Sequence, residues 1–466
     1  MGQNWTTTEN WNPSGVPNEA ALTFGSATTY TVNLENATRS VLGVTFDSSQ
    51  NYLLLNGGSS GVLSFGSGNG IIQNGAGNVI FETAVAFTGN SRTIGGTGTG
   101  TITFNNSLSR TGNGLIFNGV NEVIFGGSAA NSLGTASITI SSGTLTIAKT
   151  GTSAQNTALG TGQINFNGGT LKISNSDAVL NNAILVGGNV VFEASKLVTL
   201  GGVVTISNNR MVTYNNTEKL THTGNVTTNA ASGSRTLTLA GTGDVDFAGT
   251  IQDGANASVA ISKTGSGTIS FSGTNTYTGS TTISAGTLVV NGQISGPGPV
   301  TIEAGATLTG TGSISGATII NGAIAPGNGI GTLSIANDTT WKGSSSAGAD
   351  TNWKFELEAS NSSDKLEIAG NFVKDPTLGS TYQFDFLNTG TLGTFELIHW
   401  TGITSFSATD FSYTNLGMGY AGSFAISGNN LVFTAIPEGS ATMLFGATVA
   451  GMMIAGWWRK SRYASS

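Results

Sequence analysis

The chain has 466 residues, of which 70 are glycine and only 9% are charged, and its formal net charge is −7. Charge this sparse is unlike the solvated surface of a helical protein. A negative chain with no basic cluster before residue 459 also lacks the electrostatic footprint of a nucleic-acid-binding protein. The absence of cysteine excludes a disulfide framework and a thiolate metal site.

The first element, residues 1–19, is predicted to be an N-terminal cap. It holds Trp5, Trp11, Pro13 and Pro17, and aromatic side chains of this kind would cover the open end of a stacked structure. The segment shows no basic stretch followed by an apolar one, so no secretory signal is visible in it.

Residues 20–340 are predicted to form a stack of short strands. Runs such as TITF at 101–104 and SITI at 137–140 alternate apolar and polar residues with period two, and Gly- and Asn-rich turns separate them. One such coil cannot bury its apolar side alone, whereas parallel strands stacked about 4.8 Å apart can. At about 22 residues a coil, this region would hold roughly 14 or 15 coils over about 70 Å.

The repeating pattern is clearest at residues 271–291. A Gly-Thr-Leu sequence at Gly286–Leu288 recurs at 143–145, 169–171 and 331–333, with a near copy at 306–308. The distances from Thr287 to Thr307, and from Thr307 to Thr332, fall in the range of about 20 to 50 residues that is typical of stacked repeats. The sequence GTNTYTG at 273–279 is predicted to be a turn between two strands.

A family resemblance rests on this region. The segment TISFSGTNTYTGSTTISAGTLVVNG at 268–292 resembles the autotransporter-associated β-strand repeat of bacterial surface and secreted β-solenoids. Residues 299–336, with the turn at Pro326–Asn328, resemble the segment that follows this repeat in such proteins. The resemblance implies a right-handed parallel β-helix that is exported from the cell, and it implies no particular reaction.

Residues 341–435 are predicted to be a C-terminal β module. Apolar residues alternate over longer runs, for example at Trp353, Phe355 and Leu357, while charged residues fall on the opposite face. Longer antiparallel strands would close the rod here. A few wider coils of the same solenoid would give the same pattern.

Residues 436–466 form the most distinctive segment of the sequence. Residues 441–458 contain no charge, and Arg459, Lys460 and Arg462 follow them. Eighteen helical residues span about 27 Å, close to the hydrocarbon thickness of a bilayer, so a transmembrane helix is predicted at 441–458. The basic residues would act as a stop-transfer cluster on the cytoplasmic side. A buried C-terminal helix is the alternative.

The same tail resembles the PEP-CTERM sorting signal of Gram-negative bacteria. Pro437 and Glu438, the apolar stretch and the basic end occur in the family's order, although Gly439 stands where a second proline is usual. The resemblance implies that Pro437 and Glu438 are recognised by an exosortase, a membrane enzyme that cleaves such tails.

Few residues are candidates for catalysis. His222 and His399, the two histidines, have no acidic residue near them in sequence, and a general base needs a positioned partner. Asp244 and Asp246 are predicted to face the same side of one strand, and Asp253 follows. They are weak candidates for glycoside hydrolysis or calcium binding, although solvated surface carboxylates are the simpler interpretation. None of the common nucleotide, calcium or hydrolase motifs occurs.

Together these features predict a non-enzymatic, exported β-solenoid that serves as a structural or adhesive protein at the cell surface or in the outer envelope of a Gram-negative-type bacterium. Expected partners are the membrane, an exosortase-type enzyme and extracellular polysaccharide, and no cofactor is expected. The alternative is a carbohydrate-active β-helix enzyme, a polysaccharide lyase or hydrolase. A third hypothesis, the passenger of an autotransporter, is less favoured.

Overall fold

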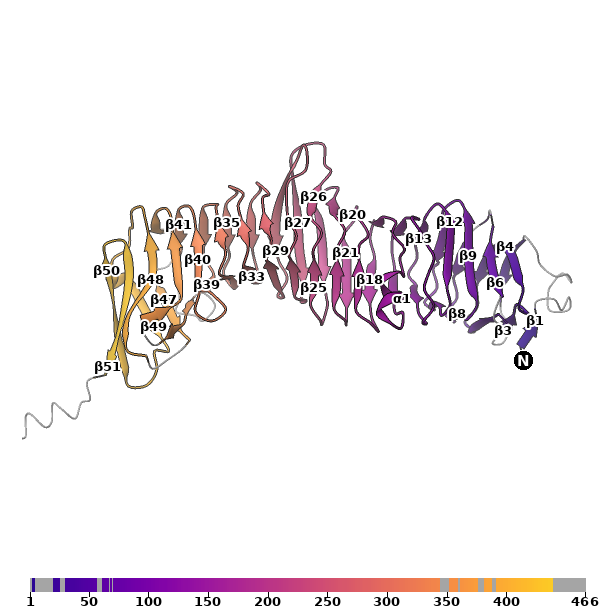
Figure 1. Cartoon of the computed structure of the whole chain (residues 1–466), viewed down its shortest axis with the longest axis horizontal. Coiled ribbons are helices and arrows are strands. Elements are labelled where there is room, and N and C mark those ends of the chain that lie inside the picture. Colours follow the sequence, from indigo (N-terminus) through magenta and orange to yellow (C-terminus); the bar gives the residue numbers. More distant parts are fainter. Residues whose placement is uncertain are drawn as a thin grey trace, which may run out of the picture.

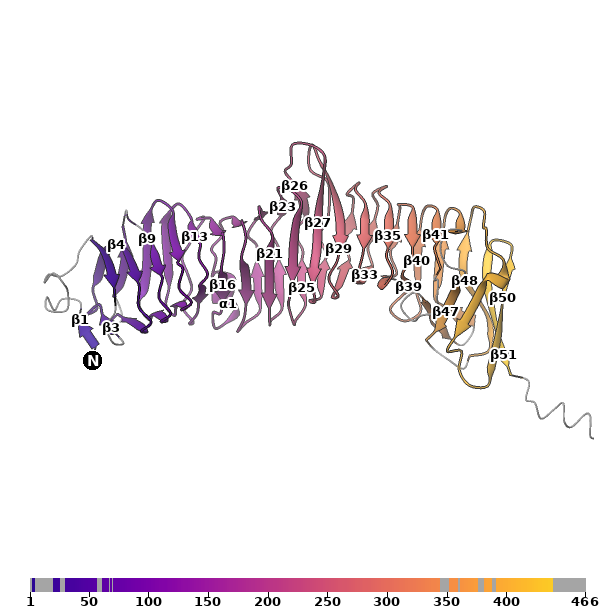
Figure 2. The ribbon, with the colours of Figure 1, turned by 180° about the vertical axis from the view of Figure 1, so that it is seen from behind.

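The computed structural model describes residues 2–4, 20–25, 30–56, 61–66, 68, 70–343, 352–358, 361–375, 381–387 and 391–438. These residues form an elongated rod of stacked β-coils, with the N-terminus at one end and the last strands at the other (Figures 1 and 2). The helical elements that lie wholly within the described ranges are the five-residue α1 (Thr152–Asn156) and the 3-10 helix η3 (Ala408–Asp410).

One parallel sheet, sheet A, follows the rod along its length and receives one strand from each coil. Adjacent coils align in register, so that Leu145 lies beside Leu171 and Thr282 beside Thr301. In spatial order its 17 strands are β1 (Gly2–Asn4), β3 (Tyr30–Asn33), β5 (Tyr52–Leu55), β8 (Val79–Phe81), β11 (Ile102–Phe104), β14 (Glu122–Phe125), β16 (Thr144–Ile147), β18 (Thr170–Ile173), β21 (Val190–Ala194), β24 (Arg210–Tyr214), β27 (Ser234–Gly241), β29 (Ser258–Lys263), β32 (Thr281–Ile283), β35 (Val300–Ile302), β38 (Thr318–Ile320), β41 (Thr339–Trp341) and β46 (Phe372–Lys374). The predicted all-β parallel solenoid is therefore confirmed.

The N-terminal half of the rod is completed by a second parallel sheet, sheet B, which forks at one long strand. The first half of β4 pairs with β6 and its second half with β7, so two rows of strands leave it. The sheet consists of β2 (Ala20–Phe24), β4 (Thr38–Phe46), one branch of β6 (Val62–Phe65), β9 (Ala84–Gly89) and β12 (Leu108–Gly112), and another of β7 (Ile71–Gln73), β10 (Arg92–Gly95), β13 (Leu115–Phe117), β15 (Ile138–Ile140), β17 (Ile164–Phe166), β20 (Ile184–Val186), β23 (Val204–Ile206) and β26 (Val226–Thr228).

The C-terminal half is completed by two further sheets. Sheet C is parallel and consists of β19 (Ala178–Leu180), β22 (Val198–Leu200), β25 (Leu220–His222), β28 (Val245–Phe247), β30 (Thr268–Phe271), β33 (Gly286–Val290), β36 (Ala306–Gly310) and β39 (Ala323–Pro326). Sheet D consists of β31 (Thr274–Asn275), β34 (Gln293–Ile294), β37 (Ser313–Ile314), β40 (Thr332–Ile335), β45 (Lys365–Ile368), β48 (Gly393–Trp400), β51 (Asn430–Pro437) and β50 (Tyr420–Ser427).

Beyond Trp341 the strands continue the parallel winding before the chain reverses. The pairs β41–β46 and β45–β48 are parallel, as is a small sheet of β42 (Trp353–Phe355), β47 (Tyr382–Phe386) and β49 (Phe411–Thr414). The pairs β48–β51 and β51–β50 are antiparallel, and so is the short pair β43 (Leu357–Glu358) and β44 (Ser362–Ser363). The hairpin of β50 and β51 closes this end of the rod (Figure 1).

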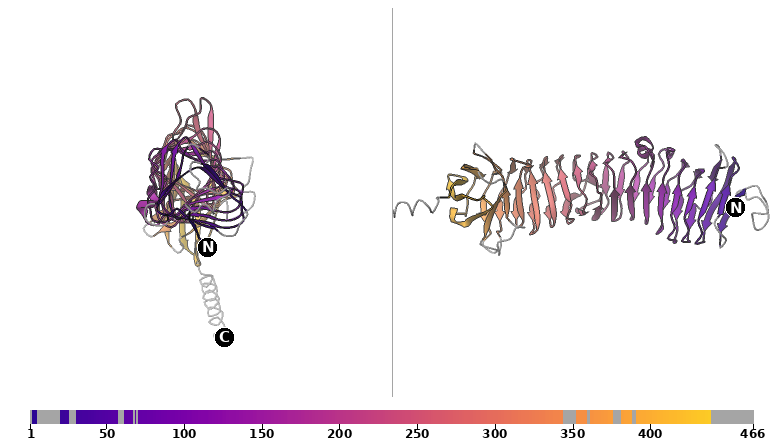
Figure 3. Two further views of the ribbon diagram at one scale, coloured as in Figure 1. Left: turned by 90° about the vertical axis from the view of Figure 1, so that its right-hand side faces the viewer. Right: turned by 90° about the horizontal axis from the view of Figure 1, so that it is seen from below.

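Inward side chains form columns along the rod axis, because every second residue of a strand points into the coil. Viewed down the axis the coils superimpose around a common interior (Figure 3). Aromatic rings stack inside from coil to coil: Phe81 lies 5.0 Å from Phe104, and Phe192 lies 5.7 Å from Tyr214, between ring centroids. Burial of these columns is the main stabilising term of the stack.

Asparagine and aspartate side chains link the turns of successive coils. Asn78 accepts hydrogen bonds at Oδ1 from the backbone N–H and the hydroxyl of Thr101, and donates its own backbone N–H to Asn51 Oδ1 at 2.8 Å. The carboxylate of Asp253 likewise accepts the N–H of Thr278 at 3.1 Å. These bonds satisfy turn donors that the strands leave unpaired, and they give the asparagine-rich turns a structural role.

The predicted transmembrane helix is corrected. In the part of the chain that the structure describes, no helix is long and apolar enough to cross a membrane. The described apolar residues alternate with period two and are buried in strands of two to nine residues instead of on a long helix. The stretch 441–458 lies outside the described residues, as do Arg459, Lys460 and Arg462 and, apart from β1, the predicted cap at 1–19.

Two local details differ from what the sequence pattern suggests. The sequence GTNTYTG is not only a turn: Thr274–Asn275 forms β31, and Tyr277 is 1% exposed. Thr307 pairs with Ala323 in sheet C, whereas Thr332 lies in sheet D, so the two threonines are not one coil apart.

Candidate functional site

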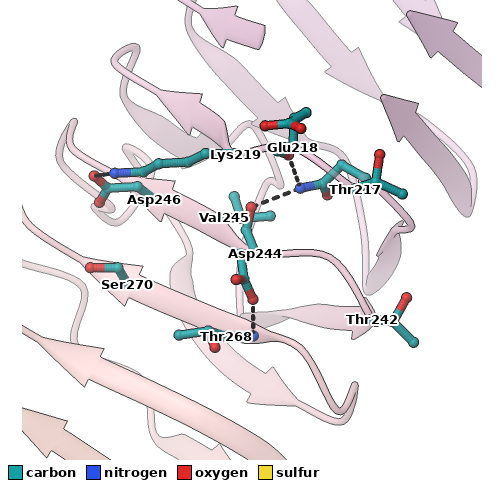
Figure 4. Close-up of a pocket in the computed structure, with 10 residues that line it drawn as sticks. Thr217, Glu218, Lys219, Thr242, Asp244, Val245, Asp246, Thr268 and Ser270 are labelled. Carbon is teal, nitrogen blue, oxygen red and sulfur yellow. Dashed lines mark hydrogen bonds and ion pairs between the residues drawn. The ribbon is translucent and has the colours of Figure 1, made fainter. Parts of the chain in front are cut away.

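A pocket of about 620 Å³ lies on the outer side of sheet C and spans three successive coils. Figure 4 shows its lining side chains, which come from β28, β30 and the segments before β25 and β28. They are Asn216, Thr217, Glu218, Lys219, Thr242, Asp244, Val245, Asp246, Thr268 and Ser270. The pocket therefore contains three carboxylates and one lysine.

Strand register places the pocket residues in rows. Leu220, Val245 and Ile269 are partners in β25, β28 and β30, so the preceding residues Lys219, Asp244 and Thr268 lie side by side one coil apart. Asp246 lies beside Ser270 in the next row. The structure thus places the predicted pair, Asp244 and Asp246, in one pocket.

Both carboxylates already have hydrogen-bonding partners. Asp246 accepts bonds from the ammonium of Lys219 at 3.1 Å and the hydroxyl of Ser272 at 2.5 Å. Asp244 accepts the backbone N–H of Thr268, one coil further on, at 2.9 Å. Asp253 is held elsewhere, by the N–H groups of Val259 and Thr278. In the described residues no group of three His, Cys, Asp or Glu side chains is arranged to hold a metal ion.

Neither histidine is among the residues that line the pocket, and the two lie on different strands, β25 and β48. His222 is 2% exposed inside the coil, where its ring stacks on Phe247 at 4.6 Å and its Nε2 lies 2.9 Å from Tyr214 Oη. Burial lowers the pKa of His222 to about 3, so the ring is neutral. His399 lies on β48, with Nδ1 2.6 Å from Asn430 Oδ1. Neither histidine contacts a carboxylate through these bonds.

Several buried ionisable groups were missed by the sequence analysis. Lys263 is 1% exposed and donates to the carbonyls of Gly265 and Ala285 at 2.6 and 3.0 Å, and burial lowers its pKa to about 8. Lys263 follows Ile261 by two residues on β29, so both side chains point to the same, inward side of the strand. This alternation could have predicted from the sequence that Lys263 is buried. Lys149 is buried with its pKa lowered to about 8 for the same reason.

Asp364 is a third buried ionisable group, and its hydrogen bonds hold a loop in place. Its two carboxylate oxygens accept the backbone N–H groups of Glu356 and Gly331 at 2.8 and 2.9 Å. Burial, together with the charges of Glu356 and Glu358, raises the pKa of Asp364 to about 7. Its geometry is that of a structural tie between Glu356, which joins β42 to β43, and the loop before β40.

The predicted sorting residues lie at the far end of the last strand. Pro437 ends β51, and Glu438 donates its backbone N–H to the carbonyl of Gly419 at 2.8 Å. Both side chains are exposed. Their predicted role in sorting stays a prediction.

Comparison with known families gives one match. Residues 261–290 match the family model described as the passenger-associated-transport-repeat. This stretch runs from the end of β29 through β30, β31 and β32 to β33, which is one circuit from sheet A back to sheet A followed by the next strand of sheet C. A search of curated proteins found no match. The chain therefore carries a passenger-type, autotransporter-associated repeat within a parallel β-solenoid.

Proposed function

We propose that the chain is an exported, non-enzymatic solenoid that works as a structural or adhesive rod at the bacterial cell surface. The observation that carries the proposal is the passenger-type repeat at 261–290, which is built into a parallel stack that follows the rod along its length. Passenger-type repeats point to export, and a rigid rod suits display over a distance.

The bonding of the pocket carboxylates favours a scaffold over a carbohydrate-active enzyme. Asp244 bridges to the next coil through the N–H of Thr268, and Asp246 is bonded to Lys219 and Ser272. A general acid or base has to exchange a proton with substrate, whereas these oxygens hold neighbouring coils together. Replacing both by asparagine would abolish hydrolysis or lysis of a polysaccharide if the enzyme hypothesis were correct.

We propose extracellular polysaccharide as the ligand of the adhesive surface. Rows of outward hydroxyl side chains repeat at the strand spacing, for example Thr282 beside Thr301 on sheet A and Thr287 beside Thr307 on sheet C. Each contact is weak, but many equivalent contacts along one rod add up through multivalency. Retention of the full chain on immobilised polysaccharides, reversed by the soluble polymer, would support this ligand, and no retention on a panel of neutral and acidic polymers would contradict it.

Export has a separate test that uses exposed lysines. The side chains of Lys219 and Lys172 are 58% and 42% exposed, so an amine reagent that cannot cross membranes should label them in intact cells producing the full chain. Labelling only after lysis, with a cytoplasmic protein as control, would contradict export.

The protein recovered from these cells also tests the proposal that an exosortase-type enzyme recognises Pro437 and Glu438, because the mass of a trimmed chain would correspond to an end near Glu438.

A further inference from the structure

Among the described residues, the hairpin of β50 and β51 covers the C-terminal end of the rod incompletely. Four half-buried side chains pack there against the core: Tyr413, Tyr420, Phe424 and Ile426. Phe424 lies 4.9 Å from Phe433 and 5.3 Å from Phe384, between ring centroids. Repeat proteins must cover such an end, because an exposed core associates with other apolar surfaces.

The strand at this end, β50, has one edge with unused backbone hydrogen-bonding groups. It pairs in sheet D with β51 alone, and it is the last strand of that sheet (Figure 1). The bond from Glu438 N–H to the Gly419 carbonyl fixes the alternation, so that odd-numbered residues of β50 face β51 and even-numbered ones face away. Of the even residues, Gly422 donates its N–H to Tyr413 Oη at 2.9 Å. The backbone groups of Phe424 and Ile426 have no partner among the described residues.

This edge carries none of the features that usually prevent strands from associating. Natural edge strands are protected by charges, proline or bulges. Residues 420–427, YAGSFAIS, contain neither charge nor proline, and their register with β51 is unbroken. The exposed side chains of the strand are small: Ser423, Ala425 and Ser427.

We propose that two copies of this chain pair through β50, antiparallel across a two-fold axis, to give a tail-to-tail dimer. In the register that uses the free groups, Phe424 of one copy lies opposite Ile426 of the other, and Ala425 lies opposite its own counterpart. An antiparallel strand is complementary to itself, so the same donors and acceptors are satisfied on both copies. The absence of charge on β50 removes repulsion between identical chains, and it leaves no charge with which to select an oppositely charged partner.

The pairing would extend sheet D from one rod into the other and cover the half-buried side chains on both. Four backbone hydrogen bonds, with the apolar contact beside them, suit a dimer of modest affinity. A heterologous contact of β50 with the N-terminal end of another copy would instead give open filaments.

A charge at the two-fold axis tests the proposal. The full chain is compared with its Ala425→Lys variant by sedimentation velocity over a concentration series, in mild detergent so that the uncharged stretch 441–458 does not itself associate. We expect a dimer for the native chain and at least a tenfold weaker dimer for Ala425→Lys. The matched control, Thr205→Lys on β23 of sheet B, should dimerise like the native chain. A monomeric native chain, growing filaments, or an Ala425→Lys variant that dimerises normally would each overturn the proposal.

Cysteine cross-linking tests the register, since the chain has no cysteine of its own. Ala425 would face its counterpart at a non-hydrogen-bonded position, where Cα atoms are about 4.5 Å apart, within the range for a disulfide. Under mild oxidation Ala425→Cys should form a covalent dimer. Ser427→Cys, also exposed on β50, should not, because Ser427 would lie opposite Ser423. Equal cross-linking of both variants would contradict the register, and cross-linking of neither would contradict the pairing.

Discussion

Replacing Trp341 by alanine should release the C-terminal coils from the rest of the rod. Trp341 is 1% exposed and lies 3.7 Å from Trp353, ring to ring, with Tyr382 and Phe384 against its edges at 5.2 and 5.6 Å. Truncating a buried tryptophan costs about 3 to 5 kcal/mol. The loss falls on one interface, because stability in a stacked protein is nearly a sum of neighbouring coil contacts.

The effect should be measurable by hydrogen exchange. In Trp341→Ala, amides of β42, β45 and β47 should exchange much faster, while those of β11 to β22 keep their native protection. Thr340→Ala is the matched control, since its side chain is the outward neighbour on the same strand, and it should leave both regions within about 0.5 kcal/mol of the native chain. Uniform loss of protection along the whole rod would show that the coils do not behave as separable neighbours.

The position of Trp341 explains why sequence patterns predicted the first part of the rod better than the last. Up to β41, coils are short, and Thr318 follows its partner Val300 by only 18 residues. After β41 the next strand of sheet A begins at Phe372, which pairs with Thr339, 33 residues earlier. The alternation of apolar and polar residues within each strand is kept when a coil is lengthened, but the spacing between repeats is lost. The sequence pattern was therefore compatible with an antiparallel module as well as with wider coils.

The repeated Gly-Thr-Leu sequence shows how far the spacing of a repeat in the sequence predicts which strands are neighbours in the stack. Leu145 pairs with Leu171, and Leu288 with Leu308, so these copies are neighbours in the stack as their spacing implies. Leu333 belongs to sheet D instead, opposite Leu366. A coil that crosses three sheets offers several sites for the same local sequence, and spacing alone does not distinguish them.

The pocket was predictable in part, because alternation along one strand puts Asp244 and Asp246 on the same outward side. The hydrogen-bonding partners of these two carboxylates could not be predicted. Lys219, Thr268 and Ser272 come from neighbouring coils, and only the structure gives the register of those coils. The buried position of His222 was harder to predict from the sequence. This residue occupies an inward position in phase with Leu220, where a polar ring is unexpected, and its partner Tyr214 lies on a different sheet.

Acidification should weaken the middle of the rod through His222. Its pKa is lowered to about 3 in the folded protein, against an ordinary value of about 6.5. Between these values the unfolded chain binds a proton that the folded chain does not, so the free energy of unfolding falls as pH falls. At up to about 1.4 kcal/mol per pH unit, the loss between pH 6.5 and pH 4 should be about 3 kcal/mol.

A double variant isolates the contribution of His222 to the pH dependence of the free energy of unfolding. Changing His222 alone to phenylalanine would leave the buried Tyr214 hydroxyl without its partner, which carries a cost of its own. In Tyr214→Phe, His222→Phe both polar groups are removed, and the stacking on Phe247 is retained. Denaturant unfolding at pH 7 and pH 4 should show a native chain that loses about 3 kcal/mol more than the double variant.

Other groups titrate in the same range, and the comparison cancels them. Asp364, with its pKa raised to about 7, acts in the opposite direction, because its folded form holds a proton that the unfolded form releases. It is present in both chains, so its contribution drops out of the difference. If the native chain and the double variant lose the same stability on acidification, the pKa of His222 is not lowered in the fold, and the prediction is wrong.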